Sequence, residues 1–225
     1  MRTIPKHKYL EAAQKFHWAT KEHFILWMTG ELKRHRRTET MLPRLVEKGK
    51  LVSKWYTDEI FGRRKVYTVP RRKNDDKFEH GLACTEGLVR CYLSEPSYVY
   101  PEHKFRGFGN VPEWGIQYKS KMVLYEHCTY SNFKHGEVKK KVQKYMDTLY
   151  DIEDEFRSLA IVIFVIDDTE QEVQNWVWRW MPMGEEYFFT DYENFLKIPI
   201  GMQYDAPIYI WGEDGKKYAL RRKNA

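Results

Sequence analysis

The sequence predicts an α+β protein built from two domains, which cover residues 1–75 and 76–225. Three observations support this fold class. In the first third of the chain, apolar residues recur at helical spacing and are followed by two β-branched segments. In the remainder, the order of helical and strand patterns is α-β-β-β-α-β. A run of six polar residues, 71–76, separates the two parts.

The two predicted domains differ in charge. The chain has 225 residues, with 38 Lys+Arg and 32 Asp+Glu, so its formal net charge is +6. Residues 1–75 hold 19 Lys+Arg against 8 Asp+Glu, whereas residues 76–225 hold 19 against 24. A basic surface of this kind attracts the phosphate backbone of a nucleic acid, although Lys and Arg also solvate helical surfaces without binding anything.

Three helices are predicted in the first domain. The apolar positions of the first helix are Ala12, Ala13, Phe16 and Trp18. Thr20 is a good N-cap for a second helix, and Gly30 is a good C-terminal stop. The apolar positions of the third helix are Met41, Leu42, Leu45 and Val46. Pro43 lies within the third helix, where its missing N–H is expected to cause a kink unless the helix starts close before it.

Two strands, at 51–52 and 66–69, follow the helices and flank a turn-rich tip at 57–64. Three helices and a hairpin form the order of a winged helix-turn-helix domain, whose third helix enters the major groove of DNA. Arg can read guanine edges there, while Thr and Lys mostly contact phosphates. The residues expected to bind double-stranded DNA are Lys33, Arg34, Arg36, Arg37, Thr38, Thr40, Arg63 and Arg64. The alternative is a small helical domain that contacts protein.

The second domain is predicted to continue past its α-β-β-β-α-β core. The core elements are a helix at 80–93, strands at 98–100, 111–116 and 122–127, a helix at 137–149 and a buried strand at 159–166. Thr169 and Glu172 predict a capping box for a further helix, and Thr190 and Glu193 predict another after a strand at 187–189. A hairpin that turns at 213–215 is predicted at the end.

This order of elements, with Pro112-Glu113 and Glu126 on the central hairpin, resembles the restriction-endonuclease-like core of the PD-(D/E)xK nuclease superfamily. The resemblance implies that Glu113 and Glu126 hold Mg²⁺, with Glu86 as a third carboxylate, and that the metal activates water. The superfamily's lysine, two residues after the second acid, is replaced here by Cys128. The candidate catalytic lysines on the following helix are Lys141 and Lys144.

A winged helix followed by such a domain is similar to the replication-relaxation family of plasmids, phages and integrative elements. The residues that carry this resemblance are His80, Thr85-Glu86, Pro112-Glu113, 123–129, 141–145 and 161–166. The family has a second acid where Cys128 stands, and this departure bears on metal binding and cleavage. The resemblance implies a DNA-binding protein that controls replication, relaxation or transfer. Its expected partners are double-stranded DNA, replication or transfer proteins and a second copy of the chain.

Two other functions stay open: a Mg²⁺-dependent DNA endonuclease or nickase, and a transcriptional regulator whose second domain dimerises or recruits partners. The sequence contains neither a GxxxxGK[ST] phosphate loop nor a G-x-S-x-G elbow, so ATP-driven work and serine hydrolysis are not expected. No apolar run reaches the length of a membrane span. Three cysteines cannot form a closed disulfide framework, so we expect a cytoplasmic protein.

Overall fold

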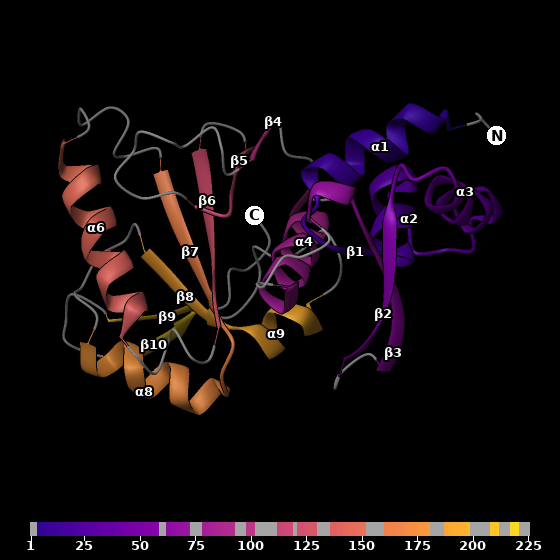
Figure 1. The fold of residues 1–225 in the computed structure, drawn as a ribbon. Helices are drawn as coiled ribbons and strands as arrows, with labels where there is room; N and C mark the ends of the chain where they lie inside the picture. Colours follow the sequence, from indigo (N-terminus) through magenta and orange to yellow (C-terminus); the bar gives the residue numbers. More distant parts are fainter. Residues whose placement is uncertain are drawn as a thin grey trace. The chain divides into compact units, whose positions relative to one another are not determined.

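In a computed structural model, the chain forms two compact units, residues 1–89 and 90–225 (Figure 1). The structure describes residues 4–58, 62–72, 78–92, 98–101, 112–118, 121–129, 136–151, 160–180, 187–198, 208–211 and 217–220. Within these ranges it contains helices and two separate sheets, which confirms the mixed α+β class. None of the described helices is long and apolar enough to cross a membrane.

The first unit begins with three helices and a three-stranded antiparallel sheet of order β1-β3-β2. Its elements are α1 (Lys6–Lys15), β1 (Ala19–Thr20), α2 (Lys21–Thr29), α3 (Arg36–Glu47), β2 (Val52–Asp58), β3 (Gly62–Thr68) and the 3-10 turn η1 (Pro70–Arg72). Three helices followed by a hairpin is the predicted order. The centre of the predicted tip, residues 59–61, lies outside the described residues.

Helix α2 has the predicted limits. The Thr20 side chain accepts a hydrogen bond from the His23 N–H, and the His23 ring accepts one from the Thr20 N–H, which together form a capping box. Gly30 ends the helix with a φ of 72°, a left-handed conformation that favours glycine. Helix α3 continues through Pro43.

The predicted first helix is too long. Helix α1 ends at Lys15, and the C-cap residue Phe16 is already extended. Trp18 lies beyond the helix because the next residues, Ala19 and Thr20, pair with β3 as strand β1. Phe16 and Trp18 are still buried, so their apolar character reflects the core rather than a helix face.

Helix α4 (Phe78–Tyr92) begins in the first unit and ends in the second. Thr85 accepts a hydrogen bond from the His17 N–H at 3.3 Å, and Leu82 packs with Trp18 and Val66. In the second unit, Arg90 donates to the Leu196 carbonyl at 3.0 Å. The division between the units therefore falls inside α4, after the polar run 71–76 predicted as the boundary, of which residues 73–76 lie outside the described residues.

The second unit is a seven-stranded sheet of order β10-β9-β8-β7-β6-β5-β4. Strands β6, β7 and β8 are parallel to one another, and the strands on both sides of them are antiparallel. The elements are β4 (Tyr98–Pro101), β5 (Trp114–Tyr118), β6 (Lys121–Cys128), α6 (Glu137–Asp151), β7 (Ala160–Ile166), α8 (Glu170–Trp180), β8 (Tyr187–Asp191), α9 (Tyr192–Lys197), β9 (Ile208–Trp211) and β10 (Lys217–Leu220). Together with α4, the elements from β4 to β7 follow the predicted order α-β-β-β-α-β.

Helices α6 and α8 cover one face of this sheet, and their apolar side chains form a single buried cluster with it. Val142 of α6 and Val177 of α8 belong to this cluster, as does Phe164 of the central strand β7. Alternate residues of β6 face the same layer, because successive strand side chains point to opposite faces. The even-numbered residues Leu124 and Cys128 lie in the cluster.

Of the two capping boxes predicted in this unit, the one before α9 was assigned the wrong N-cap residue. Thr169 accepts from the Glu172 N–H at 3.3 Å at the start of α8, as predicted. For α9 the N-cap is Asp191, which accepts from the Asn194 N–H at 2.7 Å, and not Thr190. Helix α9 begins at Tyr192, so its N-cap is the residue directly before it, whereas Thr190 lies one residue further back in β8, paired with Val165. The predicted turn at 213–215 lies outside the described residues.

Candidate functional site

A buried carboxylate lies in the apolar layer between β6 and α6. Glu126 is on the same face of β6 as Leu124 and Cys128, and its residue surface is 0% exposed. An ionised carboxylate in such a layer is costly unless charged or hydrogen-bonding partners surround it. The environment of Glu126 therefore decides what this site can do.

Helix α6 supplies the partners of Glu126. The Tyr145 hydroxyl donates to Oε1 at 2.6 Å, and the Lys141 Nζ donates to Oε2 and forms an ion pair with it. Lys141 and Tyr145 are four residues apart on α6 and so lie on one side of the helix. Both carboxylate oxygens thus accept a hydrogen bond from the same helix.

Glu113 brings a second carboxylate to this region from the neighbouring strand segment. It directly precedes β5, and its backbone N–H donates to the Tyr125 carbonyl at 3.0 Å, one residue before Glu126. Its charge contributes to raising the pKa of Glu126, which places the two carboxylates within electrostatic range. Glu113 is half-buried, so it is the more accessible of the two.

The pKa values of Glu126, Lys141 and Tyr145 are shifted because the three groups are buried and the Glu126 carboxylate lies within hydrogen-bond distance of the other two. Burial raises the pKa of Glu126, and the nearby Lys141 and Tyr145 offset this only in part. Burial lowers the pKa of Lys141, but the Glu126 carboxylate outweighs it and the net shift is upward. Burial and the Glu126 charge raise the pKa of Tyr145. Lys141 therefore stays a cation and Tyr145 a proton donor at neutral pH.

Cys128 stands two residues after Glu126, where the resemblance to the nuclease superfamily implies a lysine. Burial raises the pKa of its thiol, so it is neutral at physiological pH and is a poor nucleophile. The ammonium group beside Glu126 comes instead from Lys141, which was predicted as a replacement. The other predicted lysine, Lys144, is exposed on α6.

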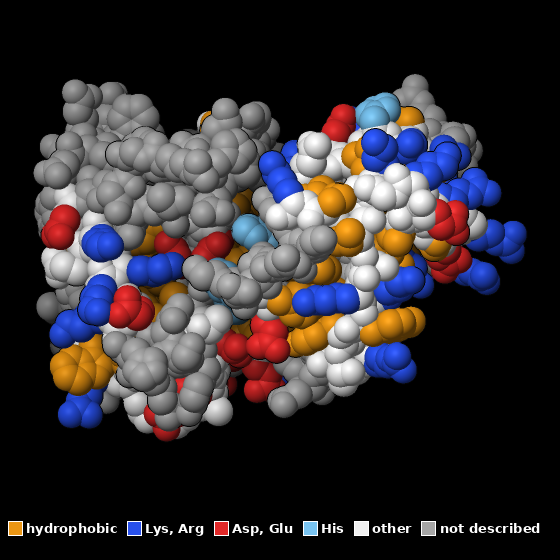
Figure 2. Space-filling model, viewed as in Figure 1, with side chains coloured by type: hydrophobic (Ala, Val, Ile, Leu, Met, Phe, Trp, Pro, Cys, Tyr) orange, Lys and Arg blue, Asp and Glu red, His pale blue; other side chains and the backbone are white. Residues whose placement is uncertain are grey.

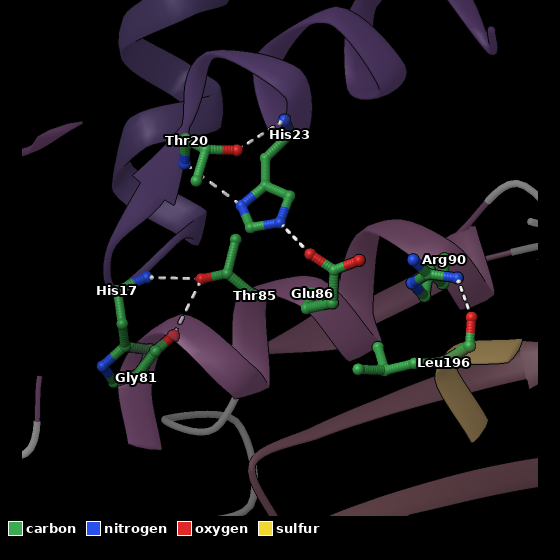
Figure 3. Close-up of polar contacts among 8 residues, drawn as sticks. All are labelled: His17, Thr20, His23, Gly81, Thr85, Glu86, Arg90 and Leu196. Carbon is green, nitrogen blue, oxygen red and sulfur yellow. Dashed lines mark hydrogen bonds and ion pairs between the residues drawn. The ribbon is translucent and has the colours of Figure 1, made fainter. Parts of the chain in front are cut away.

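The carboxylates have the chemistry of a site for a hard divalent cation. Glu113 and Glu126 offer oxygen ligands, which Mg²⁺ prefers. Each carboxylate oxygen has two lone pairs, so Glu126 can accept from Lys141 or Tyr145 and still bind a cation. The sequence interpretation missed Tyr145 as a partner, although its spacing from Lys141 was a usable signal. Glu86, the predicted third ligand, lies in the first unit, where its carboxylate contacts the His23 Nε2 (Figure 3).

Most of the predicted DNA-binding residues lie at the start of α3, whereas Arg63 and Arg64 lie on β3. Helix α3 begins at Arg36, and the His35 side chain caps it by accepting from the Thr38 N–H at 3.3 Å. Lys33 and Arg34 precede the helix rather than belong to it. The exposed members of the predicted set are Lys33, Arg34, Arg36, Thr40 and Arg63, while Arg37 and Arg64 are partly buried. Lys and Arg side chains gather on this unit in Figure 2.

Thr38 was predicted to bind DNA, but the structure places it in the protein core. Its residue surface is 0% exposed, and its hydroxyl lies 2.7 Å from the His35 Nδ1 and 3.2 Å from the Tyr9 hydroxyl. Thr38 therefore holds the start of α3 against α1 and cannot reach a phosphate. Helical periodicity could have indicated this, because Thr38 precedes the buried Leu42 by four residues.

Comparison of the chain with protein-family models, with curated proteins and with solved structures finds no match.

Proposed function

We propose that the first unit is a winged helix-turn-helix domain that binds double-stranded DNA. The chain would then serve a plasmid, phage or integrative element in the control of replication, relaxation or transfer. The observation that carries the proposal is the basic start of α3, next in sequence to a hairpin with two arginines at the beginning of β3.

The two faces of α3 support this proposal. Its buried positions are Thr38, Leu42 and Leu45. The opposite face is exposed and presents Arg36, Thr40 and Arg44 at successive turns of the helix. A helix N-terminus also carries partial positive charge and free N–H groups, which favour phosphate. The outward face of α3 therefore has the chemistry of a DNA-recognition helix.

The carboxylate of Glu39 balances part of the positive charge at the start of α3 in the free protein. Glu39 lies 3.5 Å from the Arg34 Nε and 3.6 Å from the Lys21 Nζ. Exposed ion pairs of this type contribute little to stability, on the order of 0–1 kcal/mol. Arg34 can therefore exchange its carboxylate partner for a phosphate at small cost.

A salt series of duplex-DNA binding tests the proposal. Fluorescence anisotropy would compare the wild type with the variant Arg34→Gln/Arg36→Gln/Arg37→Gln. We expect weaker binding and a plot of log affinity against log salt that is shallower by about 2 to 3. A matched control, Lys6→Gln/Lys8→Gln/Lys15→Gln, removes the same charge from the exposed side of α1. Equal weakening by the control, or binding that does not depend on salt, would contradict the proposal.

A second candidate function is metal-dependent DNA cleavage by the second unit. The contact between Glu126 and Lys141, with Glu113 beside them, favours it. In this candidate Glu113 and Glu126 hold Mg²⁺, which when bound supplies an activated water. Lys141 takes the place of the superfamily's lysine and orients the nucleophile with its ammonium group.

A supercoiled-plasmid nicking assay with Mg²⁺ or Mn²⁺ tests the second candidate. Cutting by the wild type should be lost in Glu113→Gln, Glu126→Ala and Lys141→Ala. Lys144→Ala is the matched control on the same helix and should cut normally. If the wild type shifts the plasmid on a gel without cutting it, the protein binds DNA and the cleavage candidate is wrong.

A further inference from the structure

The hairpin β2–β3 carries a large exposed aromatic side chain. Trp55 is 60% exposed near the middle of β2, although tryptophan is usually mostly buried. The other tryptophan of the first unit's sheet region, Trp18, is 1% exposed and lies in the core. Packing within the unit therefore does not explain Trp55.

Strand alternation shows which face of the sheet Trp55 occupies. Lys54 and Tyr56 point to the face that packs against Phe78 of α4, with the Lys54 Nζ 3.6 Å from the centre of the Phe78 ring. Trp55 must point to the opposite face, since successive strand side chains alternate. Tyr67 of β3 lies on this second face and contacts Phe24 of α2. Trp55 is thus on the side of the sheet that packs against α2, opposite the side that packs against α4.

Two cations accompany Trp55 on that face. The Arg63 guanidinium carbon lies 4.8 Å from the centre of the indole ring, and the Lys65 Nζ lies 6.0 Å from it. Lys65 is the direct cross-strand partner of Trp55. None of the β2–β3 hairpin residues on this face is acidic; they are Ser53, Trp55, Thr57, Arg63, Lys65 and Tyr67. Figure 2 shows basic and hydrophobic side chains next to one another over β2 and β3.

An exposed indole between cations matches a ligand that has both an aromatic face and a negative charge. A nucleotide has both features: a base can stack on the indole while Arg and Lys contact the flanking phosphates. An intact duplex covers the faces of its bases by stacking them on one another. An indole gains a stacking contact only where a base is unpaired or unstacked.

We propose that Trp55 stacks on an unpaired base, with Arg63 and Lys65 on the adjacent phosphates. The inference rests on the proposed DNA-binding function and adds a substrate class to it: duplex DNA that contains a locally unpaired segment. The surface defined by Trp55, Arg63 and Lys65 recognises the unpaired segment, and α3 binds the neighbouring duplex.

Binding of two labelled DNAs tests the inference. One is a fully paired duplex, and the other has the same sequence with a short central run of mismatches. The wild type should bind the mismatched DNA more tightly. Trp55→Leu should bind the mismatched DNA at least about fivefold more weakly and the paired duplex about as well as the wild type. Trp55→Phe should keep part of the preference, since phenylalanine retains an aromatic face.

Trp180 provides a matched control. It is also exposed, at 46%, and it has Lys139 and Arg179 within 5.1 Å of its ring, but it belongs to α8 of the second unit. Trp180→Leu should leave the preference unchanged. Because Trp55 is exposed, circular dichroism should show that its variants are folded.

Each other outcome overturns a specific claim. Equal affinity of the wild type for the two DNAs, or a preference that survives in Trp55→Leu, would overturn the inference while duplex binding stands. A Trp55→Leu variant that loses both DNAs equally would make Trp55 an ordinary duplex contact. If the wild type binds neither DNA, the proposed DNA-binding function itself is wrong.

Discussion

At the scale of single residues, the Glu126–Lys141 pair joins a buried carboxylate of β6 to a cation on α6. The carboxylate is fully buried beneath α6, and its two oxygens accept from Lys141 and Tyr145. Removing one charge of such a pair leaves the other buried and uncompensated, which costs more than the pair itself contributes. This asymmetry makes the pair testable without knowledge of its ligand.

The Lys141→Met variant should lose about 3–5 kcal/mol of unfolding free energy, because it leaves the Glu126 carboxylate without its cation. The double variant Lys141→Met/Glu126→Leu should be more stable than Lys141→Met alone. Urea denaturation of the two variants and of Glu126→Leu completes a double-mutant cycle. Lys144→Met, exposed on the same helix, should change stability by less than about 0.5 kcal/mol. Strictly additive effects would show that the two side chains do not interact.

At the scale of helices and strands, local signals predicted most of the elements and their order, while many of their exact limits differ from the prediction. The Thr20 cap and the Gly30 stop of α2 depend on neighbouring residues alone and were predicted. Thr190 was predicted as the N-cap of α9, but the cap is Asp191, one residue later; both residues pair with β7, so the local sequence did not show at which residue the strand gives way to the helix. Lys141 was identified through a family resemblance, whereas its contact with Glu126 depends on how α6 packs, which local sequence does not encode.

Gly81 of α4 packs closely against His17 within the first unit. A Cβ at this position would lie 2.8 Å from the His17 Cβ, well inside van der Waals contact. Gly81→Ala should therefore destabilise the protein by about 1–3 kcal/mol, although alanine favours helices by about 1 kcal/mol over glycine. Thermal and urea unfolding measure the change. Glu79→Ala, on the exposed side of the same helix, should be nearly neutral, and a stabilising Gly81→Ala would show that this contact is not tight.

At the scale of the whole molecule, the two units share one continuous helix. The sequence favoured a boundary at the polar run 71–76 because composition changes there. The core of the first unit nevertheless includes Leu82, which packs with Trp18 and Val66 beyond that run. Composition indicates where a chain is polar, whereas only tertiary contacts show which helix completes a core.

A fragment of residues 1–92 should be more stable than a fragment of residues 1–75. The shorter fragment lacks Phe78 and Leu82 and so exposes Trp18 to water, whereas the longer one retains them. Tryptophan emission, which shifts to longer wavelength on exposure, and urea unfolding would compare the two fragments. Equal stability would mean that α4 contributes nothing to the first unit.

Alkaline pH should weaken the second unit. Burial raises the pKa of Cys91 and of Tyr209 above their ordinary values of 9.0 and 10.0, and the bond from Tyr209 to Asp191 raises that of Tyr209 further. Both groups hold their protons more tightly when folded, so their stabilisation is complete below the unfolded pKa. It is lost as pH rises towards the folded pKa, by up to about 1.4 kcal/mol per pH unit for each group.

Urea unfolding from about pH 8 to about pH 11 measures this effect, and above pH 10 the Tyr209→Phe variant should show a shallower decline than the wild type. Circular dichroism of the second unit's sheet would follow the transition. A decline that is identical in the variant would show that Tyr209 does not contribute.

The mixed sheet of the second unit has a consequence for how fast the chain folds. The hairpins β5–β6 and β9–β10 join strands that are close in sequence, so each can form early from local contacts. The central parallel pairs β6–β7 and β7–β8 each span a helix, so a longer loop must close before their contacts form. The middle of the sheet, which holds Glu126, should therefore assemble last and set the rate of folding of this unit.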